Sequence, residues 1–188
     1  MTDSKRPKRV RGHAGFRVID GMLHRSESMH GVLVVQGPEH RPPFGVSAMV
    51  EEEDTCLVLS TPADIFVPPE HPVRVMTEVH AASPLSPGSV VVRSGSPVRF
   101  LAVVHDLDQD PSCNETWVAA ALNGVLEEAE ARGLQAIGLP MIGTLHGSLS
   151  PERFVVLLRN SLRRGSLSAL QAGLPNALQR IWLIAGEE

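Results

Sequence analysis

Short apolar runs bounded by glycine, proline and polar residues recur along the chain and predict β-strands. Valine, isoleucine, leucine and phenylalanine dominate these runs, and such side chains fit a pleated, half-buried surface. The expected strands are 16–19, 32–35, 46–50, 56–59, 90–92, 100–104, 136–139 and 181–184. The acidic stretch Glu51–Asp54 is expected to be a turn, the Pro-rich stretches 37–43 and 61–72 are expected to be loops, and 73–82 is ambiguous between a helix and a strand, with a helix slightly favoured.

A first helix is predicted before the 136–139 strand. Apolar residues recur at helical spacing from Val118 to Ala129, and three glutamates lie largely off that stripe. Ser112 and Glu115 stand in the relation of a capping box, and Gly133 is placed to end the helix.

A second helix is predicted to begin at Ser150, whose hydroxyl can cap it, followed by Pro151 in the first turn. Its apolar face runs from Phe154 to Leu162, and Gly165 is expected to close it. A separate helical piece at 167–172 is then expected to stop at Gly173. In this later half of the chain, strands and helices alternate as βαβαβ, which predicts an α/β fold with a mixed sheet flanked by helices.

Composition agrees with one globular domain: the chain has 188 residues, of which 43% are hydrophobic and 20% charged. No apolar stretch is long enough for a membrane span, and the N-terminus lacks the apolar core of a signal peptide. Two cysteines without metal-type spacing suit a reducing compartment, so a cytoplasmic location, no disulfide framework and no structural zinc are expected.

Charge is unevenly divided along the chain. Residues 1–11 hold five basic groups and one acid, whereas residues 12–188 hold 12 basic and 20 acidic residues, a net charge of −8. We therefore expect residues 1–11 to be a disordered basic tail and residues 12–188 to form a single domain. The negative charge of residues 12–188 argues against a nucleic-acid groove in the fold. Only the basic tail is then left for non-specific contact with the phosphates of a nucleic acid.

Candidate chemistry lies between the 136–139 strand and the second helix. The loop there is predicted to bind phosphate, because its glycines and its place before a helix N-terminus can present free backbone N–H groups to an anion. Its residues are Ile142, Gly143, Thr144, Leu145, His146 and Gly147. The equally weighted alternative is that the two glycines only permit a tight turn.

The strand ending at Pro140, the step Ile142-Gly143-Thr144, and Gly147 followed by Pro151-Glu152 resemble the signature of macro domains, which bind ADP-ribose and related metabolites. Gly88–Val92 and Val103-Val104-His105 resemble the family's pair of strands, so the resemblance covers roughly residues 88–184. It implies a three-layer macro-like architecture with a mixed central sheet flanked by helices. ADP-ribose or a related nucleotide is the implied ligand, and no cofactor is implied.

The sequence departs from the family at several places. The loop is one residue shorter than the family's, with His146 in place of an aromatic residue, and no Gly-Asp-Ile or Gly-Asp-Val step is present to bind adenine. If Cys56–Leu59 is the first central strand, the family's Asn-Ala-Ala-Asn is replaced by Ser60–Ala63. No catalytic residue of the family can therefore be transferred to this chain.

Three functions stay open at this point. The first is a divergent macro-like module that binds ADP-ribose or a related nucleotide. The second is a small hydrolase of ADP-ribosyl or phosphoester substrates that uses His105, Asp106 or His146, and the third is a scaffold with a closed cleft. Whether the protein is an enzyme is left undecided, and a catalytic metal is not expected.

Two single residues carry narrower expectations. Cys113, beside a helix start, is expected to be an inert buried thiol, with a lowered pKa as the alternative. A side chain at Gly147 is expected to block a bound diphosphate while the fold survives, if the loop amides hold that ligand.

Overall fold

The computed structural model describes residues 15–19, 22–59, 84–173 and 175–185. The predictions for residues 1–11, 61–72, 73–82 and Ser60–Ala63 lie outside these ranges in whole or in large part. The elements, in chain order, are β1 (Gly15–Ile19), β2 (Met22–Met29), β3 (Val32–Pro38), β4 (Ala48–Asp54), β5 (Val90–Arg93), β6 (Val98–His105), α2 (Glu115–Ala131), β7 (Ala136–Pro140), α3 (Pro151–Ala172) and β8 (Arg180–Ala185).

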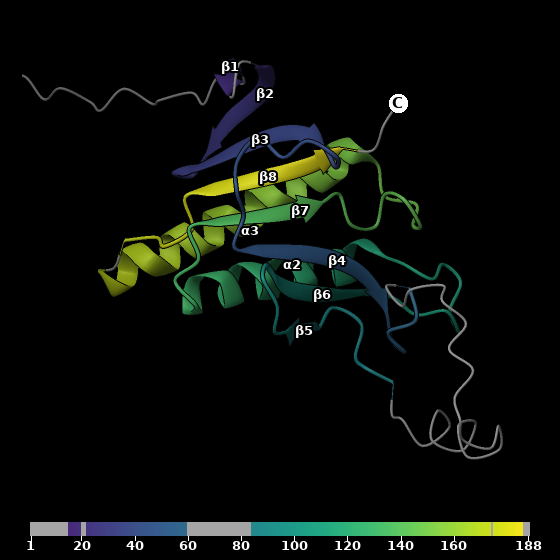
Figure 1. The fold of residues 1–188 in the computed structure, drawn as a ribbon. Coiled ribbons are helices and arrows are strands. Elements are labelled where there is room, and N and C mark those ends of the chain that lie inside the picture. The colour runs from purple at the N-terminus through teal and green to yellow at the C-terminus, as the bar shows by residue number, and fades with distance from the viewer. Residues whose placement is uncertain (1–14, 20–21, 60–83, 174, 186–188) are drawn as a thin grey trace, which may run out of the picture.

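The strands form one sheet of eight in the order β1-β2-β3-β8-β7-β4-β6-β5 (Figure 1). The five inner strands, from β3 to β6, are parallel, and the edges are closed by antiparallel pairs, β1 and β2 on one side and β5 on the other. The predicted hairpin of β5 and β6 is confirmed. The predicted α/β class with a mixed sheet is confirmed as well.

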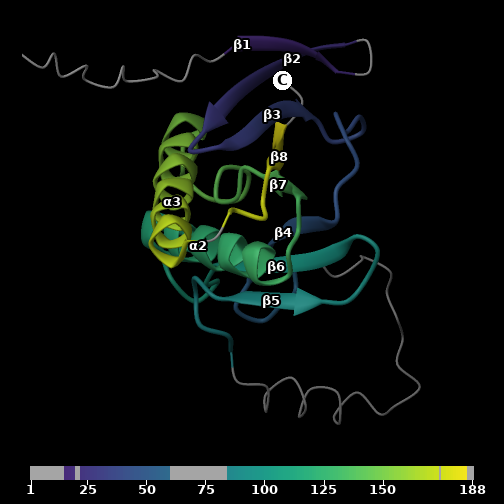
Figure 2. The same ribbon diagram turned by 90° about the vertical axis from the view of Figure 1, so that its left-hand side faces the viewer.

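Both described helices pack on the same face of the sheet (Figure 2). Alternate residues of the parallel strands face them, because successive side chains in a strand point to opposite faces. Fully buried examples are Phe100 and Val104 of β6 and Leu139 of β7, which join Leu122 of α2 and Phe154 of α3 in one apolar cluster. Neither helix is both long and apolar enough to cross a membrane.

The N-cap of helix α2 differs from the predicted one. Its N-cap is Asn114, whose side-chain oxygen accepts a hydrogen bond from the Trp117 N–H at 3.1 Å. The predicted cap, Ser112, lies two residues before this N-cap, and its carbonyl oxygen accepts the Asp106 N–H at 2.7 Å. The predicted stop is confirmed, since Gly133 follows the helix with φ +65°.

Helix α3 is longer than predicted. Its start is confirmed, with Ser150 as N-cap and Pro151 in the first turn. The helix then continues through Gly165 to Ala172 and ends at Gly173, which has φ 67°. The predicted stop at Gly165 is therefore wrong, because a single exposed glycine costs a helix only about 1 kcal/mol and does not end it.

Strand β4 corrects the largest error of the sequence analysis. Glu51–Asp54 form the second half of this strand and not a turn, whereas Cys56–Leu59 form a turn and coil and not a strand. Strand β2, with the polar sequence MLHRSESM, was not predicted at all. Both errors arise because charged and polar residues hide a strand from a search based on apolar runs.

Candidate functional site

A groove of about 1810 Å³ opens at the carboxyl ends of the inner parallel strands. Its walls come from β2 and β3, the ends of β8, β7 and β4, the loop after β7, and the first half of α3. Ligand sites in open α/β sheets lie at this end of the strands. The groove is larger than the roughly 300 to 1000 Å³ of a typical small-molecule pocket, so it has room for an extended ligand.

The loop between β7 and α3 forms part of this wall through Thr144, Leu145 and His146. Its first three N–H groups are used within the protein: Ile142 donates to the Pro140 carbonyl at 2.8 Å, Gly143 to the Glu52 carboxylate at 2.9 Å and Thr144 to the Met141 carbonyl at 3.1 Å. The next four, from Leu145 to Ser148, have no acceptor within the described part of the chain. The loop therefore presents a run of free donors just before the N-terminus of α3.

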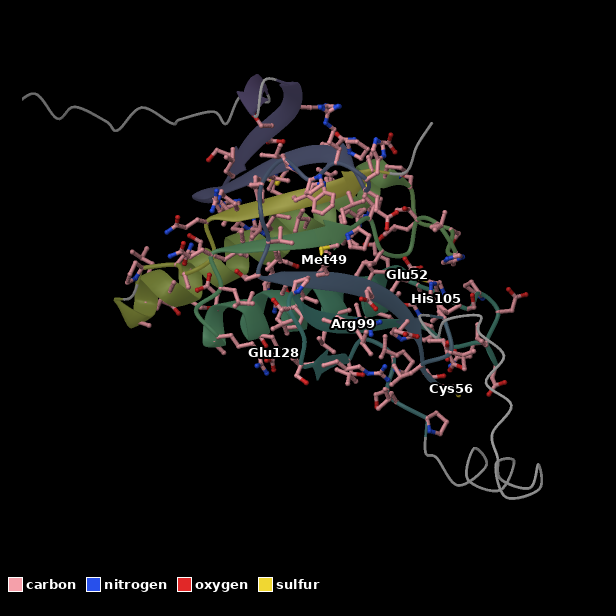
Figure 3. The ribbon with its side chains drawn as sticks, viewed as in Figure 1. Met49, Glu52, Cys56, Arg99, His105 and Glu128 are labelled. Carbon is pink, nitrogen blue, oxygen red and sulfur yellow. The ribbon has the colours of Figure 1, made fainter. Side chains whose placement is uncertain are left out.

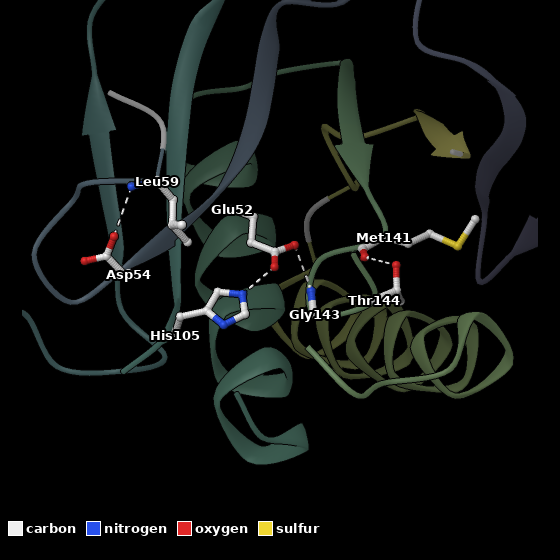
Figure 4. Close-up of polar contacts among 7 residues, drawn as sticks. All are labelled: Glu52, Asp54, Leu59, His105, Met141, Gly143 and Thr144. Atoms are coloured by element: carbon white, nitrogen blue, oxygen red, sulfur yellow. Dashed lines mark hydrogen bonds and ion pairs between the residues drawn. The ribbon is translucent and has the colours of Figure 1, made fainter. Parts of the chain in front are cut away.

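Glu52 holds this loop to the sheet (Figure 4). One oxygen of its carboxylate accepts the Gly143 N–H, and the other contacts Nε2 of His105 at the end of β6. The His105 side chain is 1% exposed and that of Glu52 is 11% exposed, so the imidazole lies behind the carboxylate and the carboxylate lines the groove. Figure 3 shows the two residues side by side at this end of the sheet.

Two further groups lie next to His105. The exposed His146 presents its ring edge-on, with ring centroids 6.3 Å apart. Cys113 pairs with His105 through a backbone bridge and is buried. Burial, followed by the negative charge of Glu52, raises the pKa of the Cys113 thiol to about 11. The expected burial of this thiol is confirmed, and the raised pKa opposes the alternative of a lowered one.

The two loop glycines are required by packing. Gly143 has φ +80°, and a Cβ there would lie 2.8 Å from Val118 Cγ2. A Cβ at Gly147 would lie 2.5 Å from the Gly143 carbonyl oxygen and 3.1 Å from Cys113 Sγ. A side chain at Gly147 would thus strain the loop itself, so the expectation that the fold would survive this change has no support in the geometry.

The other candidate acid of the sequence, Asp106, does not join the site. Its carboxylate accepts hydrogen bonds from the Asp108 N–H at 3.2 Å and the Gln109 side chain at 2.5 Å, within an exposed turn. His105 pairs with Glu52 instead, a residue that sequence reasoning placed in a turn. The signal that could have found Glu52 is its alternation with Ala48 and Val50, which lie on the same face of β4.

The remaining acids of β4 have separate roles. Glu51 points to the opposite face, where Arg99 holds it with two hydrogen bonds, one of them 2.6 Å long. Asp54 is buried and accepts the N–H groups of Cys56, Val58 and Leu59 at 2.6 to 3.0 Å. These contacts show how two of the acids are accommodated in a central strand, because the carboxylates of Glu51 and Asp54 have donors. Glu53, on the same strand, is fully buried.

The groove lining carries more acids than bases. Its acidic residues are Glu27, Glu39, Glu52 and Glu152, together with Glu51, whose carboxylate is bound by Arg99 on the other face of β4, and its cations are Arg25 and Arg159. Arg159 is bound to Glu27 at 2.9 Å, which links α3 to β2. Hydrogen bonds from its own N–H and from Ser150 lower the pKa of Glu152, so this acid stays ionised at neutral pH. No group of three or more potential metal ligands occurs among the described residues.

Sequence comparison finds no relative: no protein-family profile and no curated protein matches the chain. Comparison of folds finds similar solved structures. A macrodomain of Oceanobacillus iheyensis solved with ADP matches with a TM-score of 0.58 and 14% identity, over 86% of this chain and 88% of that one. A mutant of the same protein solved with ADPR (ADP-ribose) matches with a TM-score of 0.58 and 14% identity, over 86% and 90%. The macrodomain of Thermus aquaticus DarG matches with a TM-score of 0.53 and 17% identity, over 81% and 96%.

This chain therefore has the macro-domain fold, and the resemblance seen in its sequence is confirmed. The fold also extends the resemblance beyond residues 88–184, because the matches cover most of the chain. The central strand beside β7 and β6 is β4 and not Cys56–Leu59. The residues that end this central strand are thus Glu51–Asp54.

Proposed function

We propose that this protein binds ADP-ribose or a related phosphorylated nucleotide in the groove, with the diphosphate on the loop Ile142–Gly147. The observation that carries the proposal is the run of free N–H groups from Leu145 onward, on the wall of an open groove and at the start of a 22-residue helix. Backbone donors at a helix N-terminus bind phosphate without basic side chains. Solved macrodomains of the same fold hold ADP and ADPR.

The open groove favours binding over a scaffold role, which requires a closed cleft. The excess of carboxylates in its lining opposes an anionic ligand, so we expect modest affinity. Within the loop, the N–H groups of Leu145, His146 and Gly147 are the proposed donors, because those of Ile142, Gly143 and Thr144 already have acceptors.

Calorimetric titration of the full chain with ADP-ribose tests the proposal. The sharpest variant is Leu145→Glu, because this side chain is 79% exposed and its replacement should leave the fold intact. A carboxylate beside the bound phosphates should weaken binding about tenfold or more through like-charge repulsion. Leu145→Gln introduces a side chain with the shape of glutamate but without its charge, and this variant should bind like the wild type.

Two outcomes would contradict the proposal. One is no heat of binding in the wild type up to about a millimolar ligand, a limit that corresponds to an affinity of about 4 kcal/mol. The other is equal binding by Leu145→Glu and Leu145→Gln, which would place the ligand away from this loop.

Hydrolysis of an ADP-ribosyl or phosphoester substrate is the second candidate. The observation that favours it is Glu52, a groove-lining carboxylate backed by the imidazole of His105. A carboxylate so placed can take a proton from water. Release of ADP-ribose from a modified protein by the pure chain, abolished in Glu52→Gln, would establish it; equal rates in both would exclude Glu52 as the base.

We also propose a cytoplasmic location, because both cysteines are free and Cys56 is exposed, which suits a reducing compartment. The basic residues at 1–11, which lie outside the described ranges, are the part of the chain that we propose for any contact with nucleic acid.

A further inference from the structure

Two ionisable side chains, Glu52 and His105, lie in contact beneath the proposed phosphate loop. Burying a charged group costs free energy unless a partner compensates it, so the charge of one of these residues depends on the other. The residues are within contact distance, and His105 is almost completely enclosed. We call them the acid–imidazole pair.

The pair is connected directly to the loop. The oxygen of Glu52 that does not contact His105 accepts the Gly143 N–H at 2.9 Å. The run of free N–H donors that we propose for the diphosphate begins at Leu145, two residues after Gly143. The net charge of the pair therefore acts on a bound anion at short range and through partly buried surroundings, where screening by salt is weak.

Few other groups near the pair change charge at neutral pH. Imidazole is the side chain that titrates between about pH 5 and 8. His146 faces His105 from the loop. The thiol of Cys113, on the segment before α2, stays uncharged because its pKa is about 11. Asp54, whose backbone pairs with His105 across β4 and β6, has its carboxylate bound by the N–H groups of the following turn.

We propose that Glu52 sets the anion affinity of the groove and that His105 controls this affinity by taking up a proton. With a neutral imidazole, the pair presents one negative charge to the ligand; with a protonated imidazole, its net charge is zero. Anion affinity should therefore rise as the pH falls through the titration of His105. The inference rests on the proposed function, since it concerns the same loop and groove.

The experiment measures the affinity of the full chain for ADP-ribose and for inorganic pyrophosphate between about pH 5.5 and 8.5, the range in which imidazole changes charge. For the wild type we expect affinity to fall about 3- to 10-fold across this range, the scale of one unit charge near a partly solvated site. Inorganic pyrophosphate itself takes up protons in this pH range, so its affinity is compared between the wild type and His105→Gln, and the difference between their slopes should match the difference found with ADP-ribose.

Variants separate the two partners. Glu52→Gln keeps an oxygen that can accept the Gly143 N–H and removes the charge, so it should bind at high pH about 3- to 10-fold more tightly than the wild type and vary little with pH. His105→Gln keeps a donor for Glu52 but takes up no proton, so it should bind weakly at every pH. His146→Gln tests the neighbouring imidazole, and Glu152→Gln tests another groove carboxylate. The slope that is lost in His105→Gln should persist, at least in part, in both of these variants.

A ligand-free measurement guards against loss of folding. When the pH is varied, the NMR amide resonance of Gly143 in the wild type should shift with the same midpoint as the side-chain resonances of His105. This shift should be absent in Glu52→Gln. A static Gly143 resonance overturns the inference, and so does a slope that disappears in His146→Gln but survives in His105→Gln.

The two proposals can fail separately. Binding of both ligands with the same pH dependence in the wild type and in His105→Gln leaves the proposed function standing and refutes the control by His105. Binding of pyrophosphate with a slope that differs between the wild type and His105→Gln, but no binding of ADP-ribose, refutes the nucleotide and supports the acid–imidazole pair. Binding of neither ligand at any pH refutes both.

Discussion

The two halves of β4 differ in chemistry although they lie on the same strand and face. Ala48 and Val50, in the first half, are buried beneath the helices with Phe100 and Ile137. Glu52, two residues further on, lines the groove and binds the loop. The contrast separates two tasks: the apolar half stabilises the fold, and the polar half positions the loop after β7 beside the groove. Substitutions in the two halves should therefore have separable effects.

The largest effect is expected in the apolar region. Phe154 of α3 is completely buried in the helix-covered core. Phe154→Ala should lower the free energy of unfolding by about 3 to 5 kcal/mol, because it removes apolar contacts and leaves a cavity. Urea denaturation measures this loss. Leu167→Ala, at a 53% exposed position on the same helix, is the control and should change stability little. Equal losses in the two variants would contradict the assignment of the core.

Gly143 lies where the core and the groove meet, and its substitution should affect both. Gly143→Ala places a Cβ 2.8 Å from Val118 in a backbone with φ +80°. We expect a loss of about 1 to 3 kcal/mol from backbone strain, together with weaker ligand binding. Gly165→Ala is the opposite case, because this helical glycine has open space around it. It should raise the free energy of unfolding by about 0.5 to 1 kcal/mol and leave binding unchanged.

A smaller effect is expected at alkaline pH, from Cys113. Its pKa in the folded protein is about 11, above the ordinary value of 9.0. The protonated thiol therefore contributes stability that is fully present below about pH 9 and is lost as the pH rises toward 11. The chain is suited to this measurement, since it has no tyrosine and its two lysines are both within residues 1–11.

Urea midpoints measured at several alkaline pH values test this expectation. They should fall less steeply in Cys113→Ala than in the wild type. Cys56→Ala, at an exposed cysteine, should follow the wild type. If the two variants show the same slope, the buried thiol is not the group that titrates.

The sequence predicted the elements whose pattern reflects burial. Residues 100–104 and 136–139 form inner strands with apolar side chains, and the period of residues 118–129 places α2 on them. The cap at Ser150, which ends the loop after β7, followed from local backbone preferences. These signals lie within a few residues of the element that they predict.

The acidic half of β4 could not be predicted in this way. Glu51 is stabilised by Arg99, and Glu52 by His105 and Gly143, which are 48, 53 and 91 residues away in the chain. A carboxylate with distant donors looks, in the sequence, the same as one in a solvated turn. For the same reason, the acid–imidazole pair emerged only from the structure.

The place of β8 in the sheet has a consequence for the order of folding. It lies between β3 and β7, and no other described strand pairs directly with both β3 and β7. We therefore expect the joining of an early unit, β1 to β3, to a later unit, β4 to β7, to wait for the insertion of β8 between them. The groove takes its walls from both units, so ligand binding is expected to begin only with that insertion, and a ligand added during refolding would detect the final step.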